Sequence, residues 1–340
     1  HCKIVFMRIA IVKLSALGDI VHAMIVLQFI KKFNKDISID WIVEECYSEL
    51  LDFNPDINRV HKVNFKQFKK RKSLFFLLRE LRKVHKFGKF DLVIDLQGLI
   101  KSAIVAKLIS SDKIFGFDKY SVREPIASRF YSNKINIGYS ENVVNRNVAL
   151  ISEALKIKIN RKDISSKLPF LYCKKEHEFD FLSLKSPNIL FILGASYSSK
   201  RYPIEKTSNL IDSISANFIV IWGNENEKKL AEKLKKLSPK VIVSKKLNIN
   251  DLISLIAQVS LVIGPDTGPT HMAWALNTRS ITLFGPTPGY RNTYNTKINK
   301  VLESNSKVNP NKINKKDFSI KTIDVNDIAK LTLQLMSKKD

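Results

Sequence analysis

The segment from Gly264 to His271 constrains the fold more than any other part of the sequence. It reads Gly-Pro-Asp-Thr-Gly-Pro-Thr-His and lies between an apolar run typical of a buried strand, residues 260–263, and an apolar run typical of a helix, residues 272–276. Turns of this kind present the N–H groups of a helix N-terminus to an anion such as a phosphate. The next predicted strand, 280–284, also ends in a loop of small and rigid residues, 285–289. Two such loops predict a pocket at the carboxyl edge of a parallel sheet.

Strands and helices alternate along the chain, which predicts an α/β protein with two open parallel sheets and helices on both faces. The predicted strands are 8–13, 37–43, 90–96, 188–193, 218–222 and 241–243, and the predicted helices are 20–32, 98–109, 204–216, 225–237 and 250–258. We expect an N-terminal domain over residues 7–160 and a C-terminal domain over 188–323. A polar linker, 161–187, would join them, and a last helical segment, 324–340, would pack back on the first domain. Residues 1–6 are interpreted as an upstream extension, because the first strand pattern begins at Met7.

The charge balance points to an anionic partner. Lys and Arg number 57 against 32 Asp and Glu, a net charge of +25, which suits nucleic acid or a phosphate-rich membrane surface, although part of it could be compositional drift. The three cysteines, Cys2, Cys46 and Cys173, show no paired spacing, so a disulfide framework or zinc site is disfavoured and a reducing cytosol fits. No apolar run reaches ~18 residues, so no membrane-spanning segment is predicted.

Positive charge is concentrated between Lys62 and Lys89, where eleven Lys and Arg accompany one acid, Glu80. Leucines at helical spacing within this stretch predict a basic helix with one apolar face. The interleaved aromatics suit a membrane surface or a phosphorylated lipid better than duplex DNA; they are Phe65, Phe68, Phe75 and Phe76. The alternative is a solvated face without a partner.

Polar residues follow the predicted strand ends. Asp19 comes after the first strand and is either a helix cap or a carboxylate that can take a proton from a hydroxyl group. The same turn contains only Gly18 and lacks the Gly-x-Gly-x-x-Gly pattern, which disfavours dinucleotide binding. Neither an Asp-x-Asp pair nor a cluster of His, Cys and carboxylates is present in the sequence, so it does not favour a metal-assisted reaction.

The C-terminal half adds further candidates. The loop after strand 188–193 carries Ser196, Tyr197 and Lys200, which could hold a diphosphate or form only a solvated polar loop. Glu225 could accept a hydrogen bond from a ribose or a base edge, or cap the helix that it begins. His271 could face a ligand or simply pack on the first turns of its helix.

Several of these segments together resemble the ADP-heptose:lipopolysaccharide heptosyltransferases, most closely the type I members. The resemblance rests on residues 7–22, Asp95-Leu-Gln-Gly-Leu-Ile-Lys-Ser102, Arg123-Glu-Pro125, Trp222-Gly223, Asp266-Thr-Gly-Pro-Thr-His271 and Gly285-Pro-Thr287, in order along the chain. It implies a GT-B architecture, with two Rossmann-like, doubly wound parallel-sheet domains facing a central cleft. It also implies an inverting, metal-independent and cofactor-free transfer of L-glycero-D-manno-heptose from ADP-heptose to the first Kdo of Kdo2-lipid A.

The resemblance also implies roles for individual residues. Asp19 would be the general base and Lys200 would assist departure of the diphosphate. The donor would be bound by Ser196, Tyr197, Lys200, Glu225, Leu247, Asp266, Thr267, Gly268 and His271. The acceptor would be bound by Lys69, Lys70, Arg71, Lys72, Lys101 and Arg123. Tyr197 and the pair Pro269-Thr270 depart from the family pattern, which affects the expected shape of the sugar pocket.

The expected location is the cytoplasm, peripheral to the cytoplasmic face of the inner membrane, with the basic patch on its anionic surface and no nucleic acid as partner. Within the family, the alternative is a type II enzyme, whose acceptor already carries one heptose. From another class, a basic nucleic-acid-binding protein would explain the charge but would leave the strand-end loops without a role.

Overall fold

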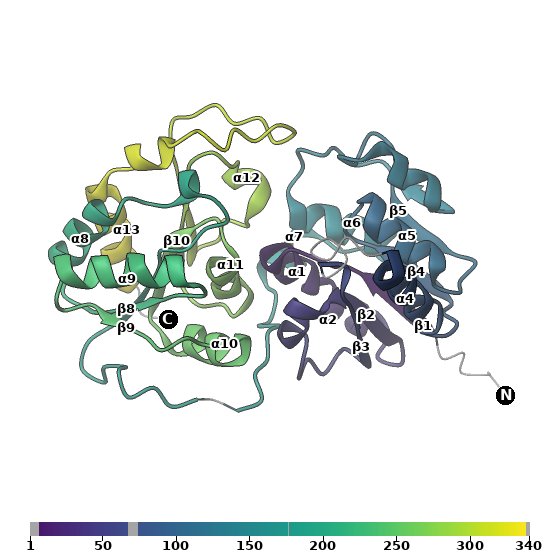
Figure 1. Cartoon of the computed structure of the whole chain (residues 1–340), viewed down its shortest axis with the longest axis horizontal. Helices are drawn as coiled ribbons and strands as arrows, with labels where there is room; N and C mark the ends of the chain where they lie inside the picture. The colour runs from purple at the N-terminus through teal and green to yellow at the C-terminus, as the bar shows by residue number, and fades with distance from the viewer. Residues whose placement is uncertain (1–6, 67–73, 176, 338–340) are drawn as a thin grey trace. The chain divides into compact units, whose positions relative to one another are not determined.

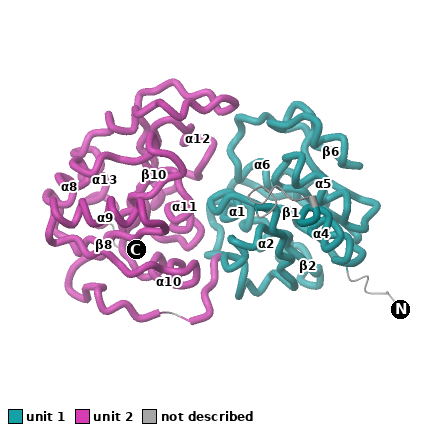
Figure 2. Tube along the Cα trace, in the orientation of Figure 1, with its two compact units in different colours: residues 1–170 teal, residues 171–340 magenta. Residues whose placement is uncertain are grey.

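The computed structural model describes residues 7–66, 74–175 and 177–337, and these form two compact units, residues 1–170 and 171–340 (Figure 2). Each unit contains one sheet of six parallel strands. The predicted α/β class with two parallel sheets is therefore confirmed.

In unit 1 the strand order is β3-β2-β1-β4-β5-β6. The strands are β1 (Arg8–Val12), β2 (Ser38–Glu44), β3 (Arg59–Val63), β4 (Leu92–Asp95), β5 (Ile114–Phe117) and β6 (Asn133–Ile135). The helices are α1 (Leu17–Met24), α2 (Val26–Phe33), α4 (Leu74–His85), α5 (Ile100–Leu108), α6 (Val143–Leu155) and α7 (Arg161–Ser165), with 3-10 turns η1 (Glu45–Leu50) and η2 (Pro125–Phe130) (Figure 1).

Unit 2 repeats this topology, with the order β12-β11-β10-β7-β8-β9. Its strands are β7 (Asn188–Ile192), β8 (Asn217–Ile221), β9 (Ile242–Val243), β10 (Leu261–Pro265), β11 (Ser280–Phe284) and β12 (Asn299–Glu303). Its helices are α8 (Ile204–Ser213), α9 (Glu225–Leu237), α10 (Ile249–Gln258), α11 (Gly268–Ala275), α12 (Gly289–Asn292) and α13 (Val325–Met336), with 3-10 turns η3 (Ser198–Lys200) and η4 (Ser319–Thr322).

Both sheets reverse their winding direction at one point, between β1 and β4 in unit 1 and between β7 and β10 in unit 2. In open α/β sheets the loops on either side of such a point diverge to opposite faces, and ligands bind in the crevice left between them. The topology thus singles out the loops after β1 and β4, and the loops after β7 and β10.

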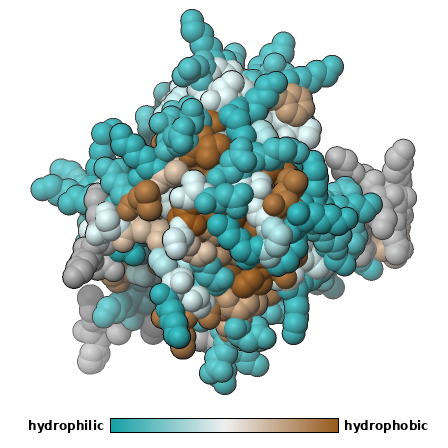
Figure 3. All heavy atoms as spheres, turned by 90° about the vertical axis from the view of Figure 1, so that its left-hand side faces the viewer, coloured by the Kyte–Doolittle hydropathy of each residue, from teal (hydrophilic) through white to brown (hydrophobic). Residues whose placement is uncertain are grey.

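Alternating strand residues of unit 2, among them Phe191, Val220 and Ile263, form one core with inward residues of α8, α9 and α13. Helix α13 belongs to this core through Ile328 and Leu335. Its apolar stripe lies against α8 of unit 2. The expectation that this helix also packs back on the first domain stays a prediction. On the side of the molecule shown in Figure 3, apolar atoms appear in small separate patches among hydrophilic side chains.

Most central strands fall close to where the sequence predicts them, whereas β3, β5, β6 and β12 do not appear among the predictions. Of these, β3, β6 and β12 are edge strands with exposed or half-buried residues, so they lack the continuous apolar run that marks a buried strand, and β5 is a buried strand of only four residues. Residues 17–19, expected in a turn, already form the start of α1. None of the helices among the described residues is both long and apolar enough to cross a membrane.

A buried carboxylate organises the carboxyl end of β4. Asp95 accepts hydrogen bonds from Ser102 Oγ at 2.8 Å and Tyr131 Oη at 2.7 Å, and from two backbone N–H groups of the following turn. Burial raises the pKa of Asp95 despite these donors. The ring of Tyr131 lies over β5, so close to Gly116 that a Cβ atom there would be 2.3 Å from Cδ2 of the ring.

We therefore expect Gly116→Ala to destabilise unit 1, because Tyr131 cannot move without losing its hydrogen bond to Asp95. Overpacking of this kind costs roughly 1–3 kcal/mol or more, which corresponds to a Tm lower by about 5 °C. Gly138→Ala is the matched control, since a Cβ there would meet only Ser140 Oγ at 3.8 Å. Equal Tm values for the two variants, measured by thermal unfolding, would contradict this reading of the packing.

Candidate active-site residues

Two charged side chains meet where the sheet of unit 2 reverses its winding direction. Asp266 follows β10 directly, and Lys200 lies in η3, in the loop after β7. The Nζ atom of Lys200 is 2.9 Å from Oδ2 of Asp266, and both residues are 8 % exposed. Because β7 and β10 are neighbours, their loops bring these residues together although they are far apart in the sequence.

Asp266 has two further donors. His271 of α11 lies with Nε2 2.8 Å from Oδ1, and Asn292 of α12 donates through Nδ2 to Oδ2 at 3.2 Å. Burial would raise the pKa of Asp266, but the charge of Lys200 and the hydrogen bond of His271 outweigh it and hold the pKa far below its usual range. The group is thus an ionised carboxylate, which accepts only, so we assign the proton of the shared hydrogen bond to Nε2 of His271.

Tyr197 adds a phenol to this group. Lys200 Nζ lies 5.5 Å from the centre of its ring and Lys315 Nζ lies 5.9 Å from it. Burial, together with the negative charge of Asp266, raises the pKa of Tyr197 to about 12. The phenol therefore stays neutral near pH 7 and can donate a hydrogen bond. Ser196, one residue earlier, is exposed.

The N-terminus of α11 opens at the same strand end. Thr267 is its N-cap and Gly268 its first residue, and the Thr267 hydroxyl lies 3.2 Å from that of Thr270. The first N–H groups of a helix have no partner within it and attract anions. Gly264 lets its strand lie close to Ile192 and Thr270, because a Cβ atom at position 264 would be 2.6 Å from Cβ of Ile192 and 2.7 Å from the Thr270 hydroxyl.

Two further residues predicted to bind the donor follow the strands β8 and β9. Glu225 is exposed at the start of α9, and Leu247 is half-buried in the segment before α10. Glu227 instead accepts from Gly223 N at 2.7 Å, while Asn224 caps the helix through Glu227 N. The sequence analysis missed Glu227, although the spacing Asn-x-x-Glu of a capping box marks it.

In unit 1 the loop after β1 leads into α1, which carries Asp19. It lies in the first turn of α1, is exposed, and accepts a hydrogen bond from Ala16 N at 3.2 Å. The residue caps the helix and its carboxylate is also exposed to solvent; its role as a base stays a prediction. The loops after β1 and β4 are joined by Gln97, whose Oε1 accepts from Leu14 N at 2.7 Å and Ser15 N at 3.1 Å. No sequence signal identified Gln97 as this link.

The structure places two of the predicted acceptor residues near one another. Lys101 on α5 forms an ion pair with the buried Glu44, with Nζ 2.6 Å from Oε1. Arg123 is exposed, and its neighbour Glu124 accepts from Ile100 N at 2.7 Å, which holds this loop at the start of α5. The other four predicted acceptor residues, Lys69, Lys70, Arg71 and Lys72, lie outside the described residues.

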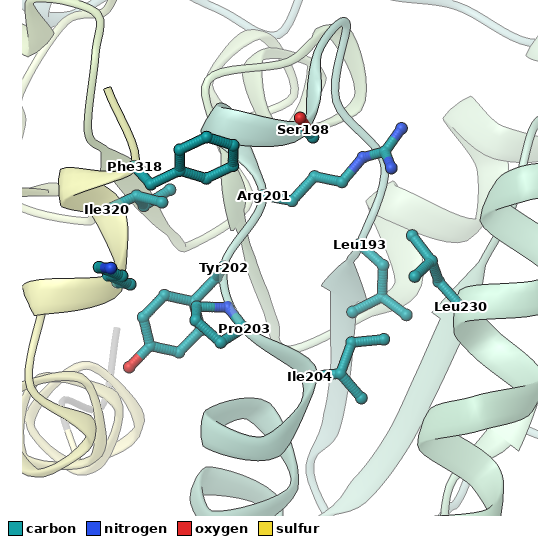
Figure 4. Close-up of a pocket in the computed structure, with 10 residues that line it drawn as sticks. Leu193, Ser198, Arg201, Tyr202, Pro203, Ile204, Leu230, Phe318 and Ile320 are labelled. Atoms are coloured by element: carbon teal, nitrogen blue, oxygen red, sulfur yellow. The ribbon is translucent and has the colours of Figure 1, made fainter. Parts of the chain in front are cut away.

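A separate pocket of about 260 Å³ lies beside η3 (Figure 4). Its walls are mainly apolar and include Leu193, Tyr202, Leu230 and Phe318. Asp266 and His271 do not line it, so it is distinct from the candidate site. Within the described ranges, no three His, Cys, Asp or Glu residues are grouped so that they could hold a metal ion.

Comparison with known proteins settles the family to which this fold belongs. Residues 77–319 match the model of glycosyltransferase family 9, the heptosyltransferases. The chain belongs to this family. It is therefore a glycosyltransferase, as the sequence motifs predicted, and the motifs from Asp95 to Thr287 lie within the matched region.

Relatives of known name agree with this assignment. The chain is 40% identical to lipopolysaccharide heptosyltransferase 1 of Campylobacter coli, covering 97% of this chain and 99% of the relative. It is 29% identical to the protein of that name from Pseudomonas aeruginosa, over 85% of this chain and 81% of the relative. The structure of the E. coli heptosyltransferase WaaC with ADP matches this chain with a TM-score of 0.78 and 25% sequence identity. The match covers 97% of this chain and 100% of WaaC.

The depressed pKa of Asp266 predicts a stability that depends on pH. A carboxylate with a lowered folded pKa contributes stability above its unfolded pKa, about 3.9, and loses it as the pH falls toward the folded value. The Tm advantage of wild type over Asp266→Asn should therefore stay level between pH 5 and 6 and shrink below about pH 4.

Asp95→Asn is the contrasting control, since the folded pKa of Asp95 is raised and its contribution declines as the pH rises above about 4. Thermal unfolding of the three proteins from pH 3 to 6 measures both trends. Parallel curves for wild type and Asp266→Asn across the whole range would show that Asp266 is not the ionised group described.

Proposed function

We propose that this heptosyltransferase moves L-glycero-D-manno-heptose from ADP-heptose to the first Kdo of Kdo2-lipid A. The observation that carries the proposal is the buried group of Lys200, Asp266 and His271 beside the N-terminus of α11, in a chain of family 9. Support for the reaction comes from the relatives named lipopolysaccharide heptosyltransferase 1 and from the WaaC structure that contains ADP.

On the donor side, the diphosphate lies against Lys200 and the first N–H groups of α11. Both provide positive charge where negative charge grows as ADP leaves. Asp266 holds the ammonium and the imidazole in place, so little reorganisation is needed during the reaction. Ser196, Tyr197, Thr267 and Gly268 donate further hydrogen bonds to the donor, and Glu225 and Leu247 contact its nucleoside.

On the acceptor side, Asp19 is the general base. Its carboxylate takes the proton of a Kdo hydroxyl, the hydroxyl oxygen bonds to the anomeric carbon of heptose, and the bond from that carbon to ADP breaks. A single displacement inverts the anomeric centre, with neither metal nor cofactor. Lys101, Arg123 and the basic residues Lys69, Lys70, Arg71 and Lys72 bind the carboxylates and phosphates of the acceptor. The enzyme acts at the cytoplasmic face of the inner membrane, attached peripherally through its basic surface.

The test is the release of ADP from ADP-heptose with Kdo2-lipid A or with heptosyl-Kdo2-lipid A as acceptor, each with and without EDTA. We expect release with Kdo2-lipid A, and we expect EDTA to have no effect. Release only with the heptosylated acceptor would assign the type II reaction, which is the alternative within the family. Loss of activity in EDTA that magnesium restores would contradict the metal-independent mechanism.

We predict that Asp19→Asn lowers turnover at least ~10²-fold while the affinity for ADP-heptose changes only a few fold, because the carboxylate serves the acceptor hydroxyl. The matched control is Asp163→Asn: Asp163 also accepts a hydrogen bond from the N-cap residue of its helix, Asn160 N at 2.8 Å. Single-turnover kinetics and donor titration separate the two effects. Should both variants keep full activity and only lose Tm, Asp19 is a helix cap alone.

A further inference from the structure

We propose that the outer face of α4 docks on a bilayer surface that carries anionic phospholipids. We define this face by Phe75, Leu78, Arg79, Arg82 and Lys86. The inference gives a location to the membrane contact included in the proposed function. It requires neither donor nor acceptor, so it can fail while the transferase activity stands.

The inner face of α4 is already used by the fold. Val84 is fully buried, and Leu77 and Leu81 pack against the core of unit 1. These residues repeat at intervals of four and three, which is the spacing of one helix face. This inner face attaches the helix to unit 1.

The outer face nevertheless carries two large apolar side chains. Phe75 is 68 % exposed and Leu78 is 45 % exposed. Arg79 and Arg82 are exposed on the same side of the helix, and Lys86 is exposed in the turn that follows its last residue, His85. Exposed apolar groups followed by cations on one face are the pattern of helices that lie in a membrane interface.

The acidic residue of this helix is largely buried beside the outer face. Glu80 is 4 % exposed, and its Oε2 accepts a hydrogen bond from Asn64 N at 2.9 Å, next to the end of β3. Arg79 and Lys83 approach it at 3.6 Å and 3.9 Å from the solvent side. With its carboxylate largely buried, the helix presents cationic groups outward.

A groove of about 750 Å³ runs along this surface, and its lining includes Phe75, Leu78, Arg82 and Lys86 together with the carboxylate of Glu80. The apolar residues lie toward one end of the helix and the cations toward the other. From Phe75 to Arg82 the helix rises ~10 Å, so a phospholipid can place its acyl chains at one end and its phosphate at the other. Duplex DNA would use the cations but would leave Phe75 and Leu78 in water.

Phe65 is not part of the proposed membrane-binding face. The sequence suggested that Phe65 is one of the membrane-facing aromatics, but it is 6 % exposed and belongs to the core of unit 1. Lys101 Nζ lies 5.5 Å from the centre of its ring. The membrane contact proposed here therefore depends on Phe75 and Leu78 and not on Phe65.

The experiment is sedimentation of the full chain with vesicles of phosphatidylcholine, alone or mixed with phosphatidylglycerol, without substrates. Wild type should bind the mixed vesicles, less strongly as salt increases, and bind neutral vesicles weakly. Arg82→Gln with Lys86→Gln should weaken binding to mixed vesicles about 30-fold, near fivefold for each charge. Phe75→Ser with Leu78→Ser should weaken it at low and at high salt, because the apolar contribution is not screened.

Matched controls come from unit 2. Lys229→Gln with Lys236→Gln removes two exposed charges from α9, and Leu237→Ser with Leu333→Ser removes two leucines that are 46 % and 57 % exposed. Both controls should bind like wild type, and thermal unfolding shows that each variant is folded. Equal losses of vesicle binding in the α4 variants and the controls would overturn the proposal. Failure of wild type to bind vesicles that lack the acceptor would also overturn it, and would mean that the α4 face binds at most the acceptor itself.

Discussion

The candidate site of unit 2 depends on one buried carboxylate. Asp266 is bonded to Lys200, His271 and Asn292, which come from the loop after β7, from α11 and from α12. A buried charge is expensive unless donors surround it, and loss of one partner of a buried pair typically costs ~3–5 kcal/mol. The four residues therefore hold the three segments in one arrangement, and the ammonium of Lys200 is fixed before any anion arrives. Such preorganisation is what stabilises a developing charge at low reorganisation cost.

The two units share a strand order but use the reversal point differently. In unit 2 the carboxylate is buried and kept ionised by its donors. In unit 1 the loops are joined by the neutral amide of Gln97 and by the Lys13 ammonium, which donates to Leu96 O at 3.0 Å, and Asp19 is left exposed. A carboxylate that positions a cation benefits from burial, whereas one that exchanges a proton with a substrate must be reachable. The same topology thus suits a donor-binding unit and an acceptor-binding unit, as we propose.

Sequence patterns predicted most of what depends on local order. The buried central strands have continuous apolar runs, and the helix α9 coincides with its predicted range, 225–237. Residues such as Lys200, Asp266 and His271 could be recognised because each follows a strand end. The partners Asn292 and Gln97 could not, since they act through contacts that only the folded chain creates. Likewise, the ion pair of Lys101 with Glu44 joins residues of two elements that periodicity does not relate.

The effect of the net charge of +25 depends on where the acidic residues lie. Next to the basic stretch of unit 1, Glu44 and Glu80 are 1 % and 4 % exposed, and their carboxylates are occupied by internal hydrogen bonds and by ion pairs with Lys101, Arg79 and Lys83. Exposed cations alone are compatible with a solvated surface, because lysine and arginine are well hydrated. Exposed Phe75 and Leu78 are not explained in that way, since each costs free energy in water and neither is needed by the core. The combination of both on one helix face favours a surface that is itself charged outside and apolar beneath, which is the structure of a bilayer.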